Sequence, residues 1–120
     1  MKLKPVVAQA GFLPLESPTY EIRQAKEPGG RGMQVTDSKR GAALAQVLGP
    51  NPVVLMRGHG ETVVGKSIKQ AVVFAVYVDI NAKMQTQALS VSKQVKVMDK
   101  SELFTDDEFD INRPWEHFRL

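Results

Sequence analysis

Val53-Val54-Leu55-Met56-Arg57-Gly58-His59-Gly60-Glu61-Thr62-Val63-Val64-Gly65 is the stretch around which this 120-residue chain is organised. Its first four residues form an apolar run with two β-branched side chains, which is typical of a strand covered on both faces. A histidine follows between two glycines, and a second β-rich run ends at Gly65. We therefore expect a buried strand, a tight turn that carries His59, and a second strand.

His59 is the residue of this turn with the most distinctive chemistry. Gly58 and Gly60 have no Cβ, so the backbone beside His59 can adopt a positive φ or pass close to another group. A neutral imidazole in such a turn suits a metal ion, and it equally suits a structural hydrogen bond. The spacing of the residues alone leaves both interpretations open.

Two helical patterns flank the central stretch. Asp37 is a good N-cap for a helix over residues 39–48, whose apolar side chains recur every three or four residues and which ends before Gly49. Ser67 and Gln70 have the spacing of a capping box at the start of a helix that runs to about residue 90. Because its first half is apolar on most sides, we expect this helix to pack on the sheet and also on a subunit interface or an absent half-domain.

The remaining segments carry weaker signals. Residues 6–13 fit either a strand or a short helix, and residues 19–23 alternate as in a half-buried strand. Residues 27–32 are a glycine-rich connection that lacks the Gly-Lys-Ser/Thr of a phosphate loop. Residues 90–97 fit a strand or a linking arm. A C-terminal arm over residues 99–120 is expected to open a helix after Asp99 and to place Pro114 first in a last short helix.

The composition is that of an ordinary soluble globular protein, with 42% hydrophobic and 24% charged residues, and one domain fits this length. The net charge of +3 is spread along the chain, unlike a nucleic-acid-binding patch. The chain has no cysteine, which excludes disulfides and thiolate ligands and fits a reducing cytosol. No run approaches the ~18 apolar residues of a membrane span. We therefore expect a cytoplasmic protein with neither a nucleic acid nor a membrane as partner.

From about residue 5 to residue 87 the chain resembles the class II aldolase/adducin family. The similarity rests on Arg57-Gly58-His59-Gly60, Val63-Val64-Gly65, Ser67, Gln70-Ala71 and Ala82-Lys83-Met84-Gln85. A second set of segments resembles the branch of aldolases and aromatic-acid decarboxylases, namely Lys4-Pro5-Val6-Val7, Gly11-Phe12-Leu13 and Asn81-Ala82-Lys83-Met84-Gln85.

This resemblance implies an α/β fold, of which residues 1–120 would form a partial domain, the C-terminal half of a three-layer α/β/α class II aldolase-like sheet. In catalytic members the histidine that matches His59 is the third ligand of a divalent metal. That metal acts as a Lewis acid on a hydroxy-carbonyl or aromatic carboxylate substrate, in aldol cleavage or decarboxylation. Zinc is the expected metal, with manganese and iron as alternatives.

The chain departs from the family pattern in its metal ligands. The family's other two ligands form a His-x-His motif, and this motif and the catalytic Glu precede the segment that resembles residues 4–6. This chain has only two histidines, His59 and His117, and no His-x-His. Since catalytic zinc sites need about three protein ligands, we expect a fragment with no catalytic residue of its own, inactive without the missing N-terminal half.

Three interpretations stay open. The chain is a fragment of a metal-dependent C–C lyase that works with its missing half or as a homo-oligomer; or it is a non-catalytic assembly module, as in the adducin branch; or it is a complete enzyme whose site combines His59, His117 and carboxylates across subunits. Arg57 is expected to pair with a carboxylate or carbonyls in the turn. Glu61 is expected either to support the metal site or to face solvent.

Overall fold

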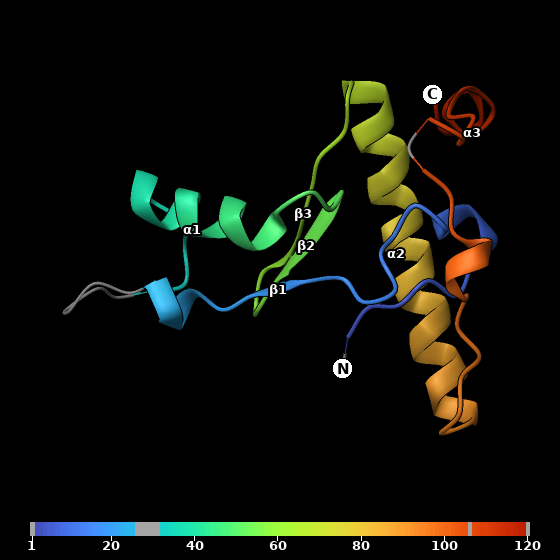
Figure 1. Ribbon diagram of the computed structural model, residues 1–120, viewed down its shortest axis with the longest axis horizontal. Coiled ribbons are helices and arrows are strands. Elements are labelled where there is room, and N and C mark those ends of the chain that lie inside the picture. The colour runs from blue at the N-terminus through green and yellow to red at the C-terminus, as the bar shows by residue number, and fades with distance from the viewer. Residues whose placement is uncertain (1, 26–31, 106, 120) are drawn as a thin grey trace.

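A three-stranded sheet lies at the centre of the computed structural model, which describes residues 2–25, 32–105 and 107–119 (Figure 1). The strands follow the order β1 (Thr19–Tyr20), β2 (Val53–Met56) and β3 (Gly60–Val63). β1 is parallel to β2, and β3 is antiparallel to it. The predicted α/β class is confirmed, whereas the larger three-layer sheet of which this would be one half stays a prediction.

The central strand β2 is buried on both faces, as its apolar run predicts. Val53 and Val54 are both fully buried, and adjacent side chains of a strand point to opposite faces. Val53 belongs to a cluster with Phe74 and Val78 of α2 (Ile68–Val91). Val54 belongs to a second cluster with β1 and the apolar residues of α1 (Ser38–Leu48). The sheet is therefore enclosed between the two helices.

The ends of α1 form as the sequence predicts. The carboxylate of Asp37 accepts a hydrogen bond of 2.8 Å from the backbone N–H of Arg40, which satisfies one of the donors that a helix N-terminus leaves free. At the other end Gly49 has φ of 55° and donates its N–H to the carbonyl of Ala45 at 3.0 Å. A residue with a side chain rarely adopts this φ, so a glycine ends the helix here.

The start of α2 forms only half of the predicted capping box. The hydroxyl of Ser67 accepts the N–H of Gln70 at 3.1 Å, but the side-chain oxygen of Gln70 binds the N–H of Lys66 at 2.6 Å instead of that of Ser67. α2 ends at Val91, close to the predicted residue 90. Ile68 is 83% exposed, so the described residues leave part of the apolar surface of α2 uncovered.

The N-terminal segment is held against α2 by the buried side-chain amide of Asn81. The amide oxygen accepts the backbone N–H groups of Val6 at 2.8 Å and Val7 at 3.1 Å, and the amide nitrogen donates to the carbonyl of Lys4 at 2.8 Å. Asn81 is fully buried. Its side-chain amide therefore satisfies backbone N–H and carbonyl groups of residues 4–7, as a neighbouring strand would in a sheet.

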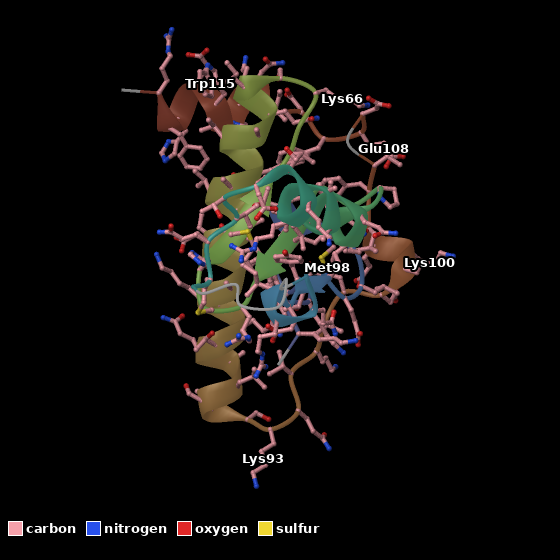
Figure 2. All side chains as sticks on the ribbon, turned by 90° about the vertical axis from the view of Figure 1, so that its left-hand side faces the viewer. Lys66, Lys93, Met98, Lys100, Glu108 and Trp115 are labelled. Carbon is pink, nitrogen blue, oxygen red and sulfur yellow. The ribbon has the colours of Figure 1, made fainter. Side chains whose placement is uncertain are left out.

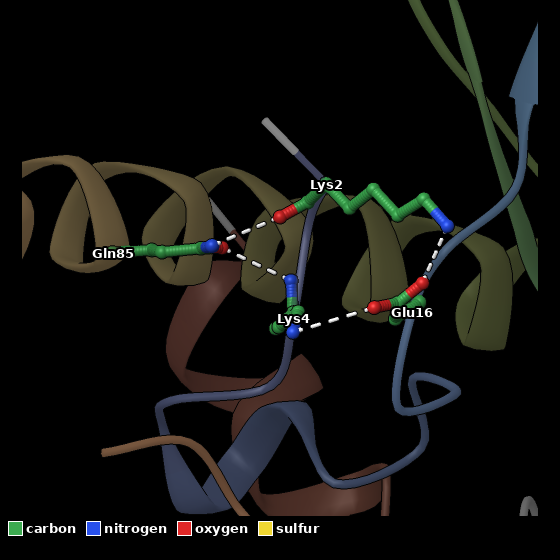
Figure 3. A network of polar contacts seen from close by, with 4 residues as sticks. All are labelled: Lys2, Lys4, Glu16 and Gln85. Atoms are coloured by element: carbon green, nitrogen blue, oxygen red, sulfur yellow. Dashed lines mark hydrogen bonds and ion pairs between the residues drawn. The ribbon is translucent and has the colours of Figure 1, made fainter. Parts of the chain in front are cut away.

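Gln85 repeats this arrangement one helical turn later (Figure 3). It accepts the backbone N–H of Lys4 and donates to the carbonyl of Lys2, both at 3.0 Å. The ammonium groups of Lys2 and Lys4 also lie 2.5 and 3.3 Å from the carboxylate of Glu16. Exposed ion pairs of this kind contribute little, so we assign the anchoring to the two amides.

The end segments settle alternatives that the sequence left open and correct the place of Pro114. Of the strand and the short helix allowed over residues 6–13, the structure forms a short 3-10 helix, η1 (Ala8–Ala10), and β1 is followed by a second one, η2 (Ile22–Ala25). Residues 92–98 are an arm and not a strand. After Asp99 only a short helix forms, η3 (Lys100–Glu102), and Pro114 is the third and not the first residue of α3 (Asn112–Phe118). Residues 27–31 of the glycine-rich connection lie outside the described residues.

After α2 the chain runs back along the molecule, from Lys93 beyond the C-terminal end of α2 to Trp115 near its N-terminal end (Figure 2). The N–H of Phe104 donates to the carbonyl of Gly11 at 3.0 Å. Phe104 stacks on Phe109 with 5.1 Å between ring centroids. A Cβ on Gly11 would lie 2.5 Å from the Phe104 ring, so this close approach needs a glycine. The arm thereby closes the core cluster around α2.

None of the described helices has both the length and the apolar character needed to span a bilayer. α2 is the longest of them, and polar side chains interrupt its apolar residues.

We predict that Asn81→Ala destabilises the protein by about 2 to 4 kcal/mol, because it leaves two backbone N–H groups and a carbonyl without a partner. Urea unfolding followed by circular dichroism measures this loss. Gln87→Ala, at an exposed position of the same helix, is the matched control and should change stability by less than about 0.5 kcal/mol. Equal effects of the two substitutions would contradict the anchoring role of Asn81.

Candidate functional site

The turn between β2 and β3 presents His59 at the end of the sheet. The N–H of His59 donates to the carbonyl of Met56 at 2.9 Å, which closes the turn. Gly58 and Gly60 have φ angles of 76° and 121°, in the region that side chains disfavour. The predicted positive φ on both sides of His59 is confirmed, and the sharp reversal leaves the imidazole exposed.

One nitrogen of the His59 ring is fixed by the backbone. Nε2 lies 2.9 Å from the carbonyl oxygen of Met33. Since a carbonyl can only accept, Nε2 carries the proton in the neutral ring, and the lone pair is left on Nδ1. Metal-binding histidines commonly hold their second nitrogen in this way, against a backbone carbonyl or a carboxylate. The His59 ring is therefore held in one orientation, in the way that metal-binding histidines commonly are.

A carboxylate ties the turn to β1. The Nε of Arg57 lies 2.5 Å from Oε2 of Glu21, and the N–H of Arg57 donates to the carbonyl of Tyr20 at 3.2 Å. Glu21 also binds the guanidinium of Arg23 at 2.9 Å. The hydrogen bonds from Arg23 and then from Arg57 hold the pKa of Glu21 well below its ordinary value of 4.5. The predicted pairing of Arg57 with a carboxylate is confirmed.

Glu61 lies on β3 opposite Leu55, and its side chain is exposed. Partial burial raises the pKa of this carboxyl, and the neighbouring carboxylate of Asp79 on α2 raises it further. Asp79 itself pairs with Lys83 at 2.7 Å. Glu61 was expected either to support the metal site or to face solvent, and its exposed position agrees with the second expectation.

His117 lies on α3, away from the turn. In Figure 1 the turn after β2 and helix α3 are well separated, with α2 between them. Within the described ranges, no three His, Cys, Asp or Glu side chains form a group that could hold a metal ion. The chain brings one oriented imidazole to the turn, and a complete metal site needs about two further donors from elsewhere.

Met33 and Glu21 are the contacts of this turn that sequence reasoning missed. They lie 26 and 36 residues from their partners His59 and Arg57. The one available signal was the alternating pattern at residues 19–23, because a strand paired with β2 brings its carboxylate beside the turn. Nothing in the sequence points to the carbonyl of Met33.

Most of the chain is similar to known proteins. Residues 6–86 match the family described as the class II aldolase and adducin N-terminal domain. The decarboxylase tropJ of Talaromyces stipitatus is 35% identical over 101 residues, which cover 77% of this chain and 38% of that protein. The 3,4-dihydroxyphthalate decarboxylase of Arthrobacter keyseri is 32% identical over 91 residues, which cover 72% and 37%.

A third relative that is named a decarboxylase matches a shorter part of the chain. The 3,4-dihydroxyphthalate decarboxylase of a Terrabacter species is 44% identical over 59 residues, which cover 48% of this chain and 24% of that protein. The chain therefore spans well under half the length of each of these relatives.

We predict that Glu21→Gln lowers the melting temperature at neutral pH and that this difference shrinks as the pH falls below about 4.5. A carboxyl whose pKa is lowered on folding stabilises the protein above its unfolded pKa, and this contribution is lost as the pH falls and the group is protonated. Thermal unfolding of both proteins between pH 7 and pH 3 measures it. Glu116→Gln, which removes the partner of one exposed arginine, is the control. A difference that stays constant with pH would contradict the assignment.

Proposed function

This chain belongs to the class II aldolase and adducin family, and on that premise we propose that it forms part of a metal-dependent C–C lyase in which His59 is one ligand of a divalent ion. Decarboxylation of an aromatic carboxylate is favoured over aldol cleavage of a hydroxy-carbonyl substrate, because three relatives carry the name decarboxylase. The three-stranded sheet would then be the C-terminal half of a larger α/β/α sheet.

The contact between His59 and the carbonyl of Met33 carries this proposal. It leaves the lone pair on Nδ1, in a ring that is exposed and held in one orientation before any metal binds. Among the described residues the ring makes this one hydrogen bond, which leaves the lone pair of Nδ1 available to a metal. The residues present thus fit one position of a metal site.

In such an enzyme a bound zinc, manganese or iron ion would supply Lewis-acid stabilisation of the negative charge left when a carboxylate leaves. The part of this chain is to position the ligand. The glycines beside His59 let the backbone reverse sharply, and the pair between Arg57 and Glu21 fixes the turn to β1. The missing ligands would come from an N-terminal half or from another subunit of a cytoplasmic homo-oligomer, without which the chain would be inactive.

A non-catalytic assembly module of the adducin type is the second candidate. The observation in its favour is the uncovered apolar surface of α2, where Ile68 is 83% and Val72 40% exposed. Such side chains favour contact with another protein surface. This candidate predicts assembly without any metal dependence, so the experiment below separates the two.

We predict that a chimera carries a divalent metal if these 120 residues replace the matching segment of the Arthrobacter keyseri decarboxylase, whose remaining part would supply the other ligands. His59→Ala in the chimera should weaken metal binding by more than the about 10- to 100-fold typical of losing a group that only supports a ligand. Metal content after dialysis and metal-dependent decarboxylation of 3,4-dihydroxyphthalate measure the effect.

His117→Ala in the same chimera is the matched control and should keep both the metal and the activity, because His117 lies apart from the turn. A folded chimera that keeps its metal after His59→Ala would refute the ligand assignment. A folded chimera that assembles without metal and without activity would favour the assembly module.

A further inference from the structure

A hollow lies where α3 and the C-terminal arm meet α2, and it shares no residue with the turn that carries His59. It measures about 680 Å³, within the range of small-molecule pockets. Its lining comes from four segments and consists of Gln9, Tyr77, Phe109, Asp110, Arg113, Pro114 and His117. The lining combines aromatic rings, a cation and a carboxylate, which is the composition of a polar ligand site with one apolar wall.

The apolar wall of the hollow is an aromatic corner. The rings of Tyr77 and Phe109 meet edge to face at 87°, with 6.0 Å between their centroids. Both side chains are half-buried, so part of each ring remains open to the hollow. Aromatic rings stack or pack edge to face at such distances. A ligand ring placed here would extend the cluster that already joins α2 to the arm.

The polar side of the hollow carries a positive charge. Arg113 and His117 are four residues apart on α3, so they occupy the same face of the helix. The guanidinium of Arg113 makes no ion pair or hydrogen bond with any other side chain in the described ranges. A planar guanidinium with several donors binds a carboxylate in two-point fashion, and a ring N–H of His117 offers one further donor.

The carboxylate of Asp110 limits which carboxylic acids the hollow can bind. Its Oδ1 accepts the backbone N–H of Asn112 at 3.0 Å, so the carboxylate is held at the hollow. A second carboxylate on the ligand would meet this negative charge, whereas a phenolic hydroxyl could donate to it. We propose that the hollow binds a hydroxylated aromatic monocarboxylate, with its carboxylate on Arg113, its ring against Tyr77 and Phe109, and its hydroxyl toward Asp110.

Saturation-transfer NMR titrations of the 120-residue chain with 4-hydroxybenzoate test this proposal. Arg113→Gln should weaken binding about tenfold or more, as expected for a lost charge-assisted hydrogen bond. Arg119→Gln is the matched control: it removes an arginine of the same region that pairs with Glu116 and does not line the hollow, and it should leave the Kd unchanged. Melting temperatures check that both variants are folded.

Two further comparisons test the ligand class. Phthalate should bind more weakly than 4-hydroxybenzoate, and Asp110→Asn should remove that preference. Cyclohexanecarboxylate, which has the charge but no aromatic ring, should also bind more weakly. Equal binding of all three acids would mean that the hollow binds anions without regard to ring or hydroxyl, which would overturn the proposed ligand class. Equal effects of Arg113→Gln and Arg119→Gln would overturn the proposed site.

The outcome is independent of the proposed function. His59→Ala should leave the Kd for 4-hydroxybenzoate unchanged, and loss of binding in that variant would place the ligand at the turn and overturn the assignment to this hollow. Failure of the chimera to hold a metal would refute the lyase proposal without touching this one.

Discussion

The structure depends on how the backbone of its first residues is satisfied. Residues 4–7 lie against α2 and not beside a strand, so several of their half-buried N–H and carbonyl groups need side-chain partners. The buried amide of Asn81 supplies three of these bonds. With this segment fixed, Leu3, Phe12 and Leu13 can join the core around α2. The arm in turn packs on that core through Phe104 and Phe109, so the helix, the N-terminal segment and the arm become one unit.

This unit positions the turn that carries His59. On one face of the sheet Val53 packs into the cluster around α2. On the other face Val54 packs into the cluster with α1. With both faces covered, the register of β2 is set, because a shift by one residue would move every side chain to the opposite face. The chain then reverses beyond the buried part of the strand. His59 is exposed because it follows β2, and it is oriented because β1 and Met33 lie beside it.

Local signals in the sequence predicted the parts of the fold that local physics determines. Asp37, Gly49 and Ser67 occupy the cap positions their chemistry favours, and the glycines beside His59 adopt positive φ. The contacts made over long sequence separations were out of reach. Gln70 binds the N–H of Lys66, which lies before the helix, and Asn81 looked like any polar residue of a helix. Its partners lie 74 to 77 residues away, at the other end of the chain.

The two histidines of the chain show why orientation matters more than residue type in assigning a ligand. Both are exposed, and a lone exposed imidazole binds metal ions weakly wherever it lies. The ring of His117 packs against that of Phe118 at a steep angle, and among the described residues no hydrogen bond selects its tautomer. His59 has its proton placed by the carbonyl of Met33, and its backbone is held by a closed turn and by the pair between Arg57 and Glu21. The entropy of ordering this imidazole is therefore lost on folding. The geometry of the turn thus holds His59 in one orientation, whereas no comparable contact orients His117 among the described residues.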